Sequence, residues 1–108
     1  MYLGIFSNKD DVIREFNIKG LDENIEILFA HYDYQDYEGY AFVLFEQDGK
    51  LYEVNGSHCS CYGLEDQWSP EETSVEAVYH YLDNGSLGND YRGVFASELR
   101  EVLTKWGG

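Results

Sequence analysis

The chain has 108 residues, 44% of them hydrophobic and 17% aromatic, which suffices for one folded domain with a modest core and excludes a disordered chain. Its formal net charge is −14, and so acidic a chain repels nucleic acid and anionic membranes. We see no secretory signal and no apolar run near the roughly 20 residues that span a membrane, so we expect a cytoplasmic protein.

A first helix is predicted to begin near Ser7, because Ser7 and Asp10 have the spacing of a capping box. Three apolar residues then share one face of this helix: Val12, Ile13 and Phe16. The helix is expected to end near Asn17, before Gly20.

Three strands are predicted next, at residues 24–34, 40–45 and 51–54, because these runs are apolar and rich in aromatic and β-branched residues. The Asp-Gly pair at 48–49 is typical of a tight hairpin, which joins the second and third strands. The longer connection at residues 33–39 forms a tip between the first two strands.

A second helix is predicted from the run Ser-Pro-Glu-Glu at residues 69–72, where Ser69 would cap the helix and Glu72 would complete a capping box. It should continue to about Leu82. The last helix is predicted from apolar residues at helical spacing, namely Phe95, Leu99, Val102, Leu103 and Trp106.

This order of elements, α-β-β-β-α-α, predicts a single α+β domain over residues 1–108. Its three strands should form an antiparallel sheet that packs against about three helices. We find no linker, internal repeat or low-complexity segment.

The negative charge lies in the middle of the chain. Residues 20–91 contain sixteen acidic side chains and one basic one, Lys50, whereas the two ends are nearly balanced. A field of this kind attracts basic partners and speeds their association. We therefore expect the middle of the chain to bind a basic surface of another protein rather than nucleic acid or a membrane.

The tip between the first two strands is the strongest candidate for contact, because it combines carboxylates with tyrosines, which are favoured at protein interfaces. A second acidic pair lies in the loop after the third strand. The alternative interpretation of the tip is an ordinary exposed turn. The candidate partner-binding residues are Asp33, Tyr34, Asp36, Tyr37, Glu38, Glu65 and Asp66.

His58, Cys59 and Cys61 carry the ligand types that zinc prefers. Their spacing differs from that of two separated ligand pairs, and a second pair would have to come from His31 and His80. Small buried thiols are the simpler interpretation. Acidic neighbours oppose thiolate formation and no other catalytic motif is present, so we expect neither an enzyme nor a cofactor.

The segment GSHCSCYGLEDQWSPEE, residues 56–72, resembles a run found in small uncharacterised proteins of bacteriophages and prophages. This resemblance implies no activity. In size and acidity alone, the chain is similar to phage inhibitors that imitate DNA, such as anti-restriction proteins, anti-CRISPR proteins and inhibitors of uracil excision. That similarity implies a protein partner in a bacterial host and assigns no functional residue.

The leading hypothesis is therefore an inhibitory protein that masks the basic surface of a nucleic-acid-processing partner, for instance one in a host defence system. Carboxylates at a density comparable with that of DNA phosphates can occupy a basic groove. The alternative is a small zinc-stabilised adaptor or interaction module organised by His58, Cys59 and Cys61.

Overall fold

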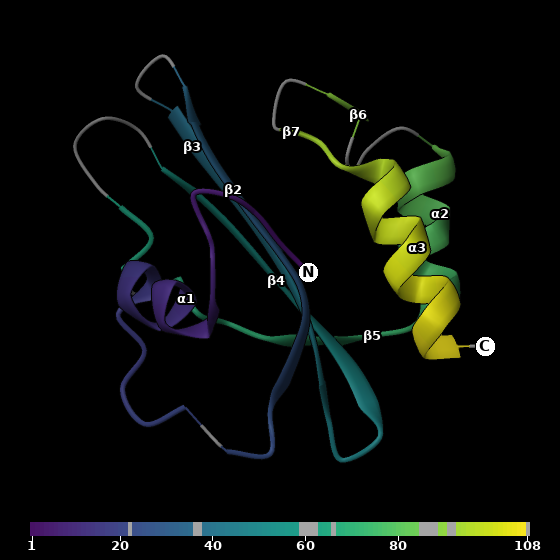
Figure 1. Cartoon of the computed structure of the whole chain (residues 1–108), viewed down its shortest axis with the longest axis horizontal. Helices are drawn as coiled ribbons and strands as arrows, with labels where there is room; N and C mark the ends of the chain where they lie inside the picture. Colours follow the sequence, from purple (N-terminus) through teal and green to yellow (C-terminus); the bar gives the residue numbers. More distant parts are fainter. Residues whose placement is uncertain are drawn as a thin grey trace.

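The structure is a computed structural model, and it describes residues 1–21, 23–35, 38–58, 63–65, 67–84, 89–90 and 93–107. A central sheet carries helix α1 (Lys9–Phe16) on one face and helices α2 (Val75–Asp83) and α3 (Ala96–Gly107) on the other (Figure 1). These are the three helices of the described residues, and the class is α+β, as the sequence predicts.

The sheet that the described residues form has five strands and is mixed, so the predicted three-stranded antiparallel sheet is wrong. The spatial order is β1-β2-β3-β4-β5, with β1 parallel to β2 and every other neighbour antiparallel. Its strands are β1 (Tyr2–Gly4), β2 (Glu26–Gln35), β3 (Glu38–Gln47), β4 (Lys50–His58) and β5 (Glu71–Thr73). A separate pair, β6 (Asn89–Asp90) and β7 (Gly93–Val94), precedes α3.

The two strands missing from the prediction are the edges of the sheet, and each has three residues. So short a strand shows no alternation of apolar and polar residues. It forms because backbone groups along the outer sides of β2 and β4 need hydrogen-bond partners. The predicted hairpin is present, with positive φ angles at both Asp48 and Gly49.

The predicted cap of α1 is wrong by one residue. Asn8, not Ser7, caps the helix, and its side-chain oxygen accepts the N–H of Asp11 at 2.9 Å. The Asp11 carboxylate in turn accepts the N–H of Ser7 at 2.9 Å. The capping logic therefore holds with the neighbouring pair of residues.

The predicted start of α2 is also wrong. The cap is Ser74, whose hydroxyl accepts the N–H of Ala77 at 3.1 Å. Residues 69–70 lie outside any helix, because residues 71–73 pair with Leu51, Tyr52 and Glu53 of β4. Pairing with the sheet edge thus prevails over the local helix signal.

Two apolar cores fill the two sides of the sheet. The core under α1 contains Phe6, Val12, Phe16, Ile25, Ala30, Tyr32, Ala41, Val43, Phe45, Val54 and Leu64. The core under α2 and α3 contains Phe29, Phe42, Leu44, Leu51, Val78, Leu82, Phe95, Leu99 and Leu103. Side chains alternate along a strand, so β2 and β3 supply both cores and are apolar on both faces.

Candidate binding site

The predicted tip between β2 and β3 is described only in part. Asp33 is half-buried, and the backbones of Tyr34 and Glu38 continue the ladder, opposite Gly39 and Gln35 respectively. Asp36 and Tyr37 lie outside the described residues. The contact role of this tip stays a prediction.

The second acidic pair is likewise half described. Glu65 is exposed, and its carboxylate accepts the N–H of Gly63 at 2.9 Å, while Asp66 lies outside the described residues. Cys59 and Cys61 lie outside them too. Within the part of the chain that is described, no three His, Cys, Asp or Glu side chains form a group that could hold a metal ion.

The three histidines occupy three different environments. His58 hydrogen-bonds through Nε2 to the Tyr32 hydroxyl on the α1 side of the sheet. His31 lies on the opposite side, with its ring 4.7 Å from that of Phe95, and His80 is exposed on α2. Since the sheet separates His31 from His58, these two residues cannot ligate one ion in this arrangement.

Burial has shifted the titration of His31. Removal of the ring from water lowers its pKa, and the charges of Asp33 and Glu98 oppose that change. Burial therefore favours the neutral form of the ring, which packs against Phe95. We see this as a packing role.

Glu53 is a buried carboxyl that sequence reasoning did not single out as a site residue. It is 8% exposed on β4, and its Oε2 atom has no hydrogen-bond partner among the described residues. Burial raises the pKa of Glu53, the charge of Glu71 on β5 raises it further, and a hydrogen bond with Thr73 opposes both. Strand β4, next to the β5 edge of the sheet, thus carries a buried carboxyl with a raised pKa.

Carboxylates gather at the end of the sheet that carries the β3–β4 hairpin. Glu26 and Glu46 are direct cross-strand neighbours, Asp48 is in the hairpin turn, and residues 51–53 near the start of β4 pair with β5. We call the set Glu26, Glu46, Asp48, Glu72 and Glu76 the acidic end. All but the half-buried Glu46 are exposed.

Two lysines lie at the acidic end, and both are engaged. Lys50 Nζ is 3.5 Å from a carboxylate oxygen of Glu72, and Lys9 Nζ donates to the carbonyl of Ile25 at 3.1 Å. Glu76, in the first turn of α2, makes no ion pair with any described residue. Negative charge therefore prevails here.

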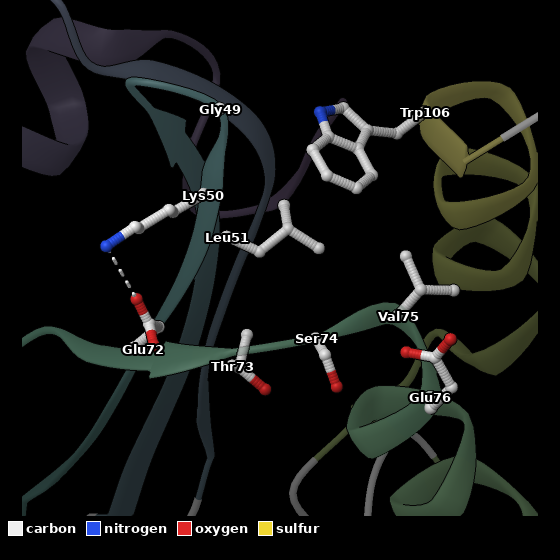
Figure 2. A pocket seen from close by; sticks show the side chains of 9 residues that line it. All are labelled: Gly49, Lys50, Leu51, Glu72, Thr73, Ser74, Val75, Glu76 and Trp106. Atoms are coloured by element: carbon white, nitrogen blue, oxygen red, sulfur yellow. Dashed lines mark ion pairs between the residues drawn. The ribbon is translucent and has the colours of Figure 1, made fainter.

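A cavity of about 540 Å³ opens at the acidic end, between β4, β5, the start of α2 and the last turn of α3. Its lining residues are Gly49, Lys50, Leu51, Glu72, Thr73, Ser74, Val75, Glu76 and Trp106. Figure 2 shows the side chains of Trp106, Leu51 and Val75 directed toward one another around the space, with the Lys50–Glu72 pair at one rim. The volume is within the range of small-molecule sites.

Trp106 is the residue of this site that sequence reasoning did not single out. It was predicted only as a member of the apolar stripe of the last helix, together with Leu99 and Leu103, which are buried. Trp106 is 39% exposed instead, because the last turn of α3 extends to the mouth of the cavity. Its position in the final turn, directly before two glycines, was the available signal.

Comparison with protein-family models, with curated proteins and with solved structures found no match. None of the helices built from the described residues is long and apolar enough to cross a lipid bilayer.

Proposed function

We propose that this protein binds a basic surface of a nucleic-acid-processing protein and masks it from nucleic acid. The observation that carries the proposal is uncompensated negative charge. Residues 20–91 contain sixteen acidic side chains and Lys50 as their one basic side chain. Many of these carboxylates are exposed and make no ion pair with any described residue: Glu23, Glu26, Asp48, Glu65, Glu71 and Glu76.

Masking follows from the electrostatics of a DNA-binding groove. Such a groove presents lysine and arginine side chains spaced to neutralise phosphates. A rigid domain that offers carboxylates to the same side chains competes with DNA for them, and complementary charge accelerates the encounter. The sheet supplies the rigidity, because both of its faces are covered by packed cores.

The resemblance of residues 56–72 to phage and prophage sequences favours a partner from a bacterial host, such as a defence protein that binds DNA. Under this proposal the protein acts in the cytoplasm of that host, without a cofactor and without catalysis. Under this proposal the partner contacts the candidate residues of the tip, the acidic end, or both, which belong to opposite ends of β2 and β3.

Capture from a bacterial lysate tests the proposal. Immobilised protein should retain nucleic-acid-binding proteins at about 50 mM salt and lose them at about 500 mM, because screening weakens contacts between exposed charges. Recovery of no nucleic-acid-binding protein at the lower salt, or retention that salt does not change, contradicts the proposal.

A further inference from the structure

We propose that the cavity beside Trp106 is a receptor for an arginine side chain of the partner protein. This inference rests on the proposed function, and it names the place where one cationic residue of the basic surface is held. The sequence placed the main contact at the tip of residues 33–39, at the opposite end of β2 and β3. The cavity is a second, chemically defined contact.

The walls of the cavity suit a cation carried on an apolar stem. Leu51 is 3% exposed and forms an apolar floor, and Val75 is half-buried at the side. Trp106 presents an indole ring at the mouth, 39% exposed (Figure 2). A methylene stem can cover the floor while its cationic head meets the ring, since indole is the strongest aromatic partner for cations.

The charges around the cavity favour a cation over an anion. Glu72 and Glu76 line it, and Lys50 is already paired with Glu72. The start of α2 would attract an anion, but the Ser74 hydroxyl already accepts the N–H of Ala77. The Glu76 carboxylate, in the first turn, also partly neutralises the positive end of the helix dipole. A phosphate or carboxylate would thus face two glutamates and a capped helix.

Arginine fits this cavity better than lysine. Its planar guanidinium is weakly hydrated and stacks on aromatic rings while its N–H groups reach carboxylates. The chain already contains one such contact, in which the Arg100 guanidinium lies 5.8 Å from the centre of the Tyr79 ring and donates to Asp83 at 2.7 Å. Trp106 and Glu76 likewise offer a ring and a carboxylate to the same cavity.

An NMR titration with short peptides tests the inference. It follows the signals of the two indole N–H groups in ¹⁵N-labelled protein. The probe is a capped peptide of four arginines separated by glycines, and the matched peptide replaces every arginine with uncharged citrulline. The arginine peptide should move the signal of Trp106 and leave that of Trp68. The Trp68 ring packs between Phe16 and Phe45 and is an internal control.

Two pairs of variants measure the contribution of the cavity. Trp106→Ala should weaken binding of the arginine peptide about fivefold, whereas Tyr81→Ala should leave it nearly unchanged. Tyr81 is the matched control because it is 41% exposed on α2 and does not line the cavity. Glu76→Gln should weaken binding about threefold, and Glu101→Gln, which removes an exposed carboxylate from α3, should weaken it less.

The outcomes separate this inference from the proposed function. The arginine peptide could bind in a salt-sensitive way without shifting the Trp106 signal and with equal affinity for each variant and its control. That result overturns the cavity as the arginine site and leaves the proposed function standing. No binding at low salt contradicts both. An equal response to spermidine or to inorganic phosphate overturns arginine as the occupant, in favour of a small polyamine or an anion.

Discussion

At the scale of single residues, Glu53 is an ionisable side chain that folding places out of water. Because burial raises its pKa, the folded state binds the proton more tightly than the unfolded chain does. The stabilisation by neutral Glu53 is fully present below the unfolded pKa and is lost as pH rises through the raised folded pKa. Stability should therefore fall with rising pH in that window.

The variant Glu53→Gln keeps the shape of the side chain and cannot ionise. We expect its urea unfolding midpoint to fall less than that of the natural chain between about pH 5 and about pH 8, since its amide does not titrate. Glu101→Gln controls for the general effect of removing a carboxylate, because Glu101 is exposed. Equal falls in the natural chain and Glu53→Gln would show that Glu53 does not carry the pH dependence.

Gly39 is a second residue at which a substitution should change the stability of the fold. A Cβ atom at this position would overlap the imidazole ring of His58. Gly39→Ala should therefore displace the ring, break its hydrogen bond with the Tyr32 hydroxyl, and lower the free energy of unfolding by about 1–3 kcal/mol.

A double-mutant cycle checks that mechanism. Tyr32→Phe removes the hydroxyl and should cost about 1 kcal/mol. If both changes act on the same contact, the double variant costs less than the two single changes together. Strict additivity, measured by denaturant unfolding, would mean that Gly39→Ala acts elsewhere.

At the scale of elements, the predicted cap of α2, Ser69, differs from the observed cap, Ser74. Ser74→Ala removes the hydroxyl that accepts the N–H of Ala77 and should destabilise the protein by about 1 kcal/mol. Ser69→Ala removes no helix cap in this structure and should have an effect within about 0.5 kcal/mol. If thermal unfolding instead showed that Ser69→Ala destabilises the protein more than Ser74→Ala, the helix would begin at residues 69–72.

The sequence was sufficient for the elements whose signals are local. The helix positions near 9–16 and 96–107, the three long strands and the Asp48-Gly49 turn follow from apolar spacing and turn chemistry. The edges β1 and β5 do not, because they exist only through pairing with β2 and β4. For the same reason, the strong capping signal at residues 69–72 failed.

The sequence was sufficient to predict that a candidate site is rich in carboxylates, but not where on the fold they lie. The excess of carboxylates between residues 20 and 91 is visible in the sequence. Their meeting at the acidic end depends on strand register, which puts Glu26 beside Glu46 and brings β5 to β4. Trp106 joins them only because α3 runs beside the sheet toward that end (Figure 1).

At the scale of the whole molecule, a net charge of −14 opposes the compact state through mutual repulsion. Added salt should therefore raise the melting temperature between about 20 mM and about 300 mM sodium chloride, because the screening length shrinks over that range. A melting temperature that falls with added salt would mean that favourable ion pairs outweigh the repulsion.

Competition with DNA tests masking most directly. A DNA-binding protein captured at low salt is bound to a labelled duplex, and the acidic protein is then added while the mobility of the duplex is followed. We expect the acidic protein to release free duplex at concentrations near those at which it binds the DNA-binding protein alone. The reason is that the acidic protein and the duplex need the same basic side chains. A complex that contains both the acidic protein and the duplex, or a duplex that stays fully bound, would contradict masking.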